Sequence, residues 1–211
     1  MHNLAFANGV ALSEDETFVV VLETLASRII KYYIKGPESG KHEIFIEGLP
    51  GLPDNVHQDN NKGFLVSLVT YADSDFPQLA QSLMPHPYIR RMLARLMSVV
   101  EAPFKCLQSY YPNEYSEKIV HYVGHFESTM FLAPKITLIL RINEKGKIVE
   151  TAYGTDGSLE GISSAFIHKD YLWFGSPFAE YVGRLPLKSV FPTLANEQKR
   201  NDQKKPKKST N

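Results

Sequence analysis

The chain is a succession of short apolar runs separated by polar turns or by turns that contain glycine and proline. Runs of this length, bounded by turn residues, predict β-strands. Phe18–Thr24 (FVVVLET) is β-branched and mostly apolar, as a buried strand would be, whereas His42–Ile46 (HEIFI) alternates like a half-exposed outer strand. Together with Gly9–Leu12 and Arg28–Ile34 they predict a first antiparallel meander.

Two further groups of strands follow the first one. The second group is predicted at Asn55–Gln58, Phe64–Thr70, Thr137–Ile142 and Lys147–Ala152, and the third at Ile162–His168, Tyr171–Gly175 and Tyr181–Leu187. Four-stranded meanders repeated around an axis are typical of β-propellers. We therefore expect an all-β fold of about three four-stranded blades, the last without its fourth strand. Three blades cannot close a ring, so such a half-propeller would expose strand edges and could self-associate.

A segment of a different kind, residues 71–135, interrupts the second group. Within it, Pro87–Ala102 predicts a helix, and Pro103 is expected to end that helix. Arg90, Arg91 and Arg95 lie off the apolar stripe of the helix, which consists of Ile89, Met92, Leu93, Leu96, Val99 and Val100. Two interpretations remain open. The helix either packs on the surface of the propeller or acts as a lid or a membrane-surface helix.

Composition and charge narrow the functional classes. With 43% hydrophobic and 22% charged residues the chain is of ordinary globular type, and its net charge of zero provides no global field to attract nucleic acid. The charge is uneven, since the part from Leu187 onward holds seven Lys/Arg and two Asp/Glu. We expect one domain over residues 1–191 and a disordered Lys-rich tail over 192–211, with nucleic-acid contact or targeting as the alternative reading of the tail.

No segment of the chain has the pattern of a secretory signal or of a membrane anchor. Cys106 is the single cysteine, which excludes an internal disulfide.

Two short segments carry the candidate chemistry. Phe6–Val10 (FANGV) and Pro50–Val56 (PGLPDNV) stand at the start of the first and second predicted meanders. In a propeller these positions converge on the central channel, where Asn8, Asp54 and Asn55 would present the hard oxygen ligands that Ca²⁺ prefers. Calcium takes about six to eight oxygens, so water, backbone and other blades would have to supply the rest. The alternative is that these Asn and Asp side chains only cap turns.

The same segments carry a resemblance. FANGVALSEDETFVVVLETLASRIIKYYIKGP, LPGLPDNV and ISSAFIHKDYLWFGSPF resemble the strictosidine synthase-like family, in the group of the adipocyte plasma membrane-associated proteins, from about Leu4 to Leu187. The chain resembles paraoxonases and gluconolactonases more distantly. The resemblance implies the C-terminal half of a six-bladed propeller. It also implies a central calcium held by Asn8, Asp54 and Asn55, which would polarise an ester or lactone carbonyl.

The family's catalytic glutamate has no counterpart in this chain. The position of that residue in strictosidine synthase falls on Ser163 or Ser164, and a serine hydroxyl cannot serve as a general base unaided. Strictosidine synthesis is therefore not expected. His57 follows Asn55 by two residues, on the same strand face, and with Ser163 and Ser164 it is a candidate for a pocket at the channel mouth. The alternative is that His57 is a structural histidine whose ring is hydrogen-bonded within the fold.

Two functional hypotheses follow. The first is a calcium-dependent hydrolase of the arylesterase or lactonase type, acting on a small-molecule ester or lactone. The second is a non-catalytic, membrane-associated propeller that binds a partner or a small ligand, with calcium as a structural ion. The resemblance further implies an N-terminal anchor that this chain does not contain, and a location at a membrane, in the secretory pathway or at the cell surface.

Overall fold

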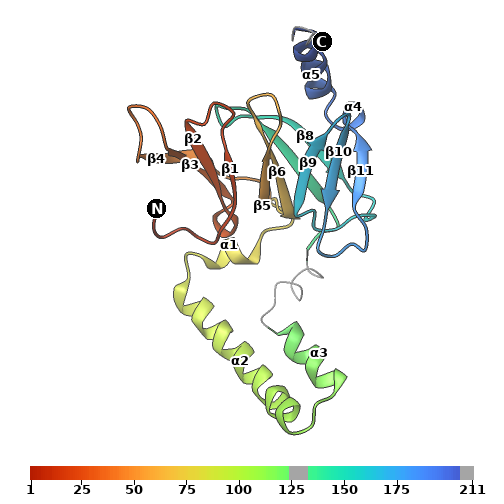
Figure 1. The fold of residues 1–211 in the computed structure, drawn as a ribbon. Helices are drawn as coiled ribbons and strands as arrows, with labels where there is room; N and C mark the ends of the chain where they lie inside the picture. The colour runs from red at the N-terminus through yellow and green to blue at the C-terminus, as the bar shows by residue number, and fades with distance from the viewer. Residues whose placement is uncertain (124–132, 205–211) are drawn as a thin grey trace. The chain divides into compact units, whose positions relative to one another are not determined.

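In a computed structural model of the chain, which describes residues 1–123 and 133–204, the protein divides into two compact units. The first unit consists of Met1–Ala72 and Lys135–Asn211 and contains every strand of the described residues (Figure 1). The second unit, Asp73–Pro134, is helical. The predicted insertion is thus a separate compact unit.

The strands of the first unit form three antiparallel sheets, each with its strands in chain order. The first sheet is β1 (Ala7–Leu12), β2 (Phe18–Glu23), β3 (Arg28–Tyr33) and β4 (His42–Ile46), and a 3₁₀ turn η1 (Thr24–Ala26) links β2 to β3. The second is β5 (Gly51–Gln58), β6 (Phe64–Tyr71), β7 (Thr137–Ile142) and β8 (Ile148–Gly154). The third is β9 (Ser164–His168), β10 (Tyr171–Gly175) and β11 (Gly183–Pro186). The predicted meanders of four, four and three strands are confirmed.

The three sheets pack face to face in chain order. One apolar core joins the first and second sheets and includes Phe18, Leu22, Phe64 and Val66, all buried. A second core, on the other side of the second sheet, includes Leu65, Ile139, Leu172 and Phe174. Both faces of the second sheet are therefore covered, which explains why β6 (FLVSLVTY) and β7 (TLILRI) are apolar without alternation.

The inner strand of each sheet, β1, β5 or β9, contacts the inner strand of the neighbouring sheet. Gly9 of β1 makes this approach close, since a Cβ there would lie 2.7 Å from the carbonyl oxygen of Asp54 and 2.9 Å from Cα of Asn55. Strand β5 begins at Gly51, ahead of the predicted Asn55, and is irregular between Leu52 and Val56. The irregularity takes Asp54 and Asn55 out of the ladder with β6.

The predicted disordered tail is wrong for residues 192–204. These residues form helix α5 (Pro192–Lys204), which follows the short helix α4 (Leu187–Val190). Phe191, Leu194 and Ala195 are buried in the second core, because their i, i+3, i+4 spacing places them on one helical side. The remaining Lys-rich residues, 205–211, lie outside the described residues.

The helical unit contains α1 (Leu79–Leu83), α2 (Pro87–Tyr110) and α3 (Glu114–Tyr122). The prediction of a helix from Pro87 is confirmed, but its predicted end at Pro103 is wrong, because α2 continues to Tyr110. Pro103 leaves the carbonyl of Val99 without its helical donor, and both residues are exposed, so water can hydrate that carbonyl. None of the helices in the described ranges combines the length and the apolar character needed to cross a membrane.

Candidate functional site

The candidate residues come from the three inner strands. Asn8 is the second residue of β1, Asp54 and Asn55 lie in the irregular part of β5, and Ser164 begins β9, directly after Ser163. Residues far apart in the sequence meet here because the inner strands lie beside one another (Figure 1).

Asn8 and Asp54 form a direct pair. Nδ2 of Asn8 donates a hydrogen bond of 2.5 Å to Oδ1 of Asp54, and both residues are half-buried. Burial raises the pKa of Asp54 above its ordinary value, and the hydrogen bond from Asn8 lowers it by less. No basic side chain of the described residues forms an ion pair with Asp54. The site therefore holds a partly desolvated carboxyl group without a compensating cation from residues 1–123 or 133–204.

Asn55 is oriented by the segment that precedes β9. Its backbone N–H and its Nδ2 both donate to the carbonyl oxygen of Ser163, at 3.1 and 3.0 Å. These bonds use the backbone N–H and one N–H of the amide, and Oδ1 of Asn55 has no hydrogen bond within the described ranges. Oδ1 of Asn8 and Oδ2 of Asp54 are in the same situation. Two amide oxygens and one carboxylate oxygen thus have no donor among the described residues. They could coordinate a cation or accept hydrogen bonds from a ligand.

His57 and Ser164 form the second pair, across β5 and β9. Nε2 of His57 lies 3.0 Å from Oγ of Ser164, and its ring centroid lies 6.1 Å from that of Phe166. Burial lowers the pKa of His57 below its ordinary value, which keeps the imidazole neutral at pH 7. Nε2 could accept a proton in that state, but no group of the described residues hydrogen-bonds Nδ1 to orient the ring. Ser163 differs, since its Oγ donates to the carbonyl oxygen of Gly175 at 3.4 Å.

The backbone beneath the site is fixed from the first sheet. Oγ1 of Thr24 donates a buried hydrogen bond of 2.8 Å to the carbonyl oxygen of Pro53, and Oγ of Ser27 donates one of 2.7 Å to that of Gly51. Both carbonyls belong to the part of β5 that precedes Asp54, where the ladder with β6 is irregular. Thr24 of η1 and Ser27, which follows it, thus bond the irregular part of β5 and position Asp54.

The oxygen atoms of this site are of the kind that a hard cation prefers, but there are too few of them to complete its coordination. Carboxylate and amide oxygens are what Ca²⁺ prefers, whereas it needs about six to eight of them. Within the described ranges, no three His, Cys, Asp or Glu side chains gather closely enough to hold a metal. A calcium ion at Asp54 would therefore need Asn8, Asn55, backbone oxygens, water and residues outside the described ranges.

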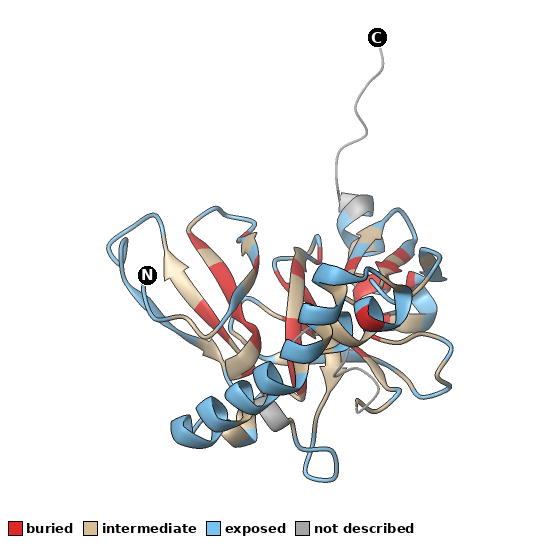
Figure 2. Ribbon diagram, turned by 90° about the horizontal axis from the view of Figure 1, so that it is seen from below, coloured by how far each residue is buried: buried red, intermediate tan, exposed pale blue. Residues whose placement is uncertain are grey.

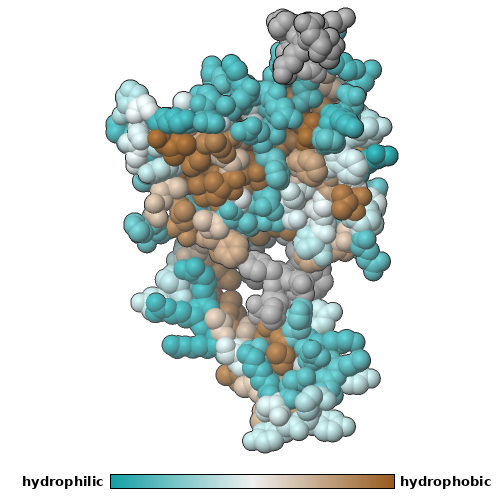
Figure 3. All heavy atoms as spheres, viewed as in Figure 1, coloured by the Kyte–Doolittle hydropathy of each residue, from teal (hydrophilic) through white to brown (hydrophobic). Residues whose placement is uncertain are grey.

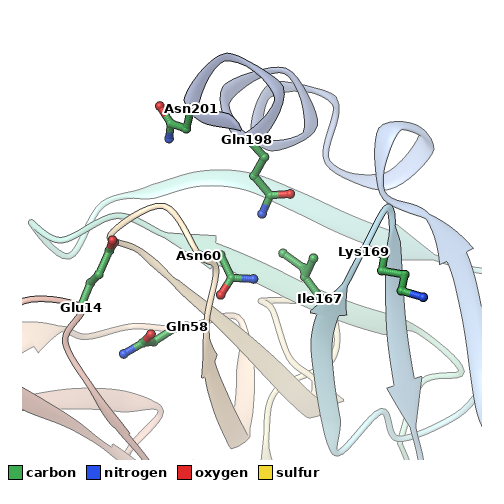
Figure 4. A pocket seen from close by; sticks show the side chains of 7 residues that line it. All are labelled: Glu14, Gln58, Asn60, Ile167, Lys169, Gln198 and Asn201. Atoms are coloured by element: carbon green, nitrogen blue, oxygen red, sulfur yellow. The ribbon is translucent and has the colours of Figure 1, made fainter. Parts of the chain in front are cut away.

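A pocket of about 460 Å³ lies at the opposite ends of the inner strands, away from Asp54. It lies between the turns that follow these strands and helix α5 (Figure 4), and it is lined by Glu14, Gln58, Asn60, Ile167, Lys169, Gln198 and Asn201. Sequence reasoning missed this pocket, because two of its residues belong to the helix that was predicted to be disordered. Apart from Ile167 its lining is polar, and these residues include no pair of groups arranged for catalysis, so the chemistry is better placed at Asp54 and His57.

Comparison with known proteins supports the family suggested by the sequence. The strictosidine synthase family profile matches residues 1–37. The adipocyte plasma membrane-associated protein Hemomucin of Drosophila melanogaster is 44% identical over 92% of this chain and 34% of its own length. The human adipocyte plasma membrane-associated protein is 28% identical over 90% of this chain and 39% of its own length. In Arabidopsis thaliana, the protein STRICTOSIDINE SYNTHASE-LIKE 10 is 30% identical over 87% of this chain and 42% of its own length.

Among solved structures, a luciferin-regenerating enzyme matches 89% of this chain and 47% of its own chain, with a TM-score of 0.47 and 13% identity. That likeness is too low to support an argument about fold or function. The chain spans between a third and a half of the length of the curated relatives described above. Over about 90% of its residues, the chain belongs to the strictosidine synthase-like family, together with the adipocyte plasma membrane-associated proteins.

Proposed function

We propose that the three sheets are part of a six-bladed propeller whose central channel binds calcium at Asn8, Asp54 and Asn55, and that the whole protein hydrolyses aryl esters or lactones. The observation that carries this proposal is the half-buried carboxyl group of Asp54, oriented by Asn8 and without a cation in the described residues. A bound cation would relieve the cost of burying that charge.

The packing of the sheets supports the propeller. The sheets stack face to face with their inner strands adjacent, as blades do around an axis. The surfaces at the two ends of the stack remain partly apolar. Phe166 and Tyr171 of the third sheet are 44% and 37% exposed, and apolar surface is also visible around the first sheet (Figure 3). Further blades would cover such surfaces.

The residues of this chain would have the following roles in hydrolysis. A bound calcium ion would polarise the carbonyl group of an ester or lactone. Asp54 would supply negative charge to the ion, and Asn8 and the carbonyl of Ser163 would hold Asp54 and Asn55 in place. Nε2 of His57, neutral at pH 7, would accept a proton from the water that attacks the carbonyl carbon and pass it to the leaving oxygen. Strictosidine synthesis is not part of the proposal, because Ser163 and Ser164 stand at the position of the family's catalytic glutamate.

The test is the hydrolysis of phenyl acetate and of an aliphatic lactone by the native protein, with calcium and with a chelator. Asp54→Asn should lower kcat/KM by about two orders of magnitude or more, because a Lewis-acid ion supplies several kcal/mol. The control is Asp156→Asn, which makes the same change in an exposed turn where the carboxylate bonds only Ser158. Unchanged turnover in Asp54→Asn would contradict the hydrolase proposal.

A second function is favoured by one observation, the absence of a complete acid–base set in the described residues. His57 has no partner that orients its ring, and the two serines cannot act as bases unaided. In that case the protein is a membrane-associated propeller that binds a partner or a small ligand, and calcium is a structural ion. Membrane association is proposed because relatives are named membrane-associated proteins. Calcium would then raise the melting temperature without any hydrolysis above background.

A further inference from the structure

Helix α2 exposes an apolar face along its whole length. None of its residues is buried (Figure 2). Six apolar side chains that are between 42% and 69% exposed, here called the α2 apolar face, are Ile89, Met92, Leu96, Val99, Val100 and Leu107. At 3.6 residues per turn they fall within an arc of about 100°. This is a continuous strip, in contrast to apolar residues scattered over a surface.

The neighbouring helix does not cover this strip. Helix α3 packs against α2 and is fixed there by Gln108, which accepts hydrogen bonds from the backbone of Asn113 and from Oγ of Ser116. The half-buried residues of α2, Leu93, Glu101, Phe104 and Gln108, cluster on the side of the helix that includes Gln108. The α2 apolar face lies next to that side and is left exposed within the described part of the unit.

The charges on α2 favour one kind of partner. Arg90, Arg91 and Arg95 have no ion pair among the described residues, whereas the acidic Glu101 is paired with Lys105 at 2.8 Å. A second copy of α2 packed on this face would bring the same arginines together, and Glu101, the one acidic residue of α2, is already paired. A surface of lipid phosphates supplies the opposite charge.

The residues near the two ends of α2 also favour a lipid surface. Tyr88 and Tyr110 are 82% and 86% exposed, and tyrosine is enriched where a membrane meets water. The helix is not apolar enough to cross a membrane, and a helix with a strong apolar strip and a basic border lies in the interface instead.

We propose that the helical unit, Asp73–Pro134, binds an anionic lipid surface, with the α2 apolar face in the headgroup–acyl boundary and the three arginines on lipid phosphates. The proposal does not depend on calcium or on hydrolysis. It would give the protein a membrane contact within the region that interrupts the second sheet.

The experiment is flotation of the full 211-residue chain with phosphatidylcholine vesicles, with and without phosphatidylserine. We expect binding to the vesicles with phosphatidylserine, and weaker binding as salt rises, because exposed charges are screened. Met92→Glu with Leu96→Glu should lower the bound fraction at least about tenfold, since it places charge in the acyl boundary. Arg91→Gln with Arg95→Gln should lower the partition coefficient about fivefold per arginine.

The matched control is Ala94→Glu with Ser98→Glu. It adds the same charges at the same spacing on the opposite side of α2, and both residues are exposed, so it should lose only the electrostatic share of the binding, whereas the apolar-face variant should lose the apolar share as well. Equal loss in both variants, binding that is independent of phosphatidylserine, or no binding at all would overturn the proposal. Light scattering without lipid is the last check. A dimer that Met92→Glu with Leu96→Glu dissociates would assign the face to a second copy and also overturn it.

Discussion

Arg141 joins the C-terminal helix to the second sheet, and its removal is the sharpest test of that helix. Arg141 belongs to β7, is 5% exposed, and bonds three carboxylates: Asp59 at 2.8 Å, Glu150 at 2.8 Å and Glu197 at 2.6 Å. Burial lowers the pKa of Arg141, and the bonds to the carboxylates outweigh burial and raise it. Glu197 is the member that comes from α5.

The change is Arg141→Met, which keeps most of the side-chain volume and removes the cation. Asp59 is fully buried and Glu150 nearly so, so their charges would be left unpaired. Breaking a buried pair in this way costs about 3–5 kcal/mol. Net stabilities of native proteins are about 5–15 kcal/mol, so the variant should lose a large share of its stability. At about 2–4 °C per kcal/mol for this size, the melting temperature should fall by about 10 °C.

The assay is urea unfolding followed by the fluorescence of Trp173, the single tryptophan, together with hydrogen exchange of the α5 amides. Glu197→Gln is the control, because its side chain is 37% exposed and should cost about 1 kcal/mol or less. Arg141→Lys should fall between the two, since lysine keeps the charge but not the planar fork. If Arg141→Met stays within about 1 kcal/mol of the unmodified protein, the reasoning is refuted.

Three more outcomes are expected. Gly9→Ala should cost about 1–3 kcal/mol in urea unfolding, because its Cβ would meet the backbone of Asp54 and Asn55 at less than 3.0 Å; a neutral effect would contradict the close approach of β1 to β5. Stability should fall as pH drops below about 6.5, since the pKa of His57 is lower folded than unfolded and the unfolded chain binds the extra proton. His57→Gln should make stability depend less on pH in this range, and an unchanged pH dependence would be evidence against this role of His57. Leu194→Ala should cost about 2–5 kcal/mol and speed exchange in α5; slow exchange there would show that α5 docks without this side chain.

The strands could be predicted because their signals are local. Apolar runs and turn residues located all three meanders, and the adjacency of the inner strands follows from the repetition of one motif. That adjacency brings Asn8 to Asp54 across 46 positions of sequence, as the propeller expectation required. Calcium binding by these residues remains a prediction.

What sequence reasoning missed depends on distant contacts. Helix α5 is rich in Lys, Asn and Gln, a composition typical of disorder, and it is held by Phe191, Leu194 and the bond that Glu197 accepts from Arg141. A charged residue inside the apolar run TLILRI indicates that Arg141 needs a buried partner. The sequence does not identify that partner, because Asp59 lies 82 positions earlier. Pro103 was expected to end a helix, a rule that fails where the freed carbonyl is exposed to water.

The central claim is a cation site at Asp54, and the most direct measurement is the unfolding temperature of the native protein in calcium and in chelator, for the unmodified protein and for Asp54→Asn. Because burial raises the pKa of Asp54, the folded state loses stability as pH rises through that pKa, so Asp54→Asn should be the more stable protein in chelator. At calcium one hundred times its dissociation constant, the unmodified protein should gain about 2.7 kcal/mol and become the more stable of the two. The account is contradicted if calcium leaves the unmodified protein unchanged, or if Asp54→Asn responds to calcium equally.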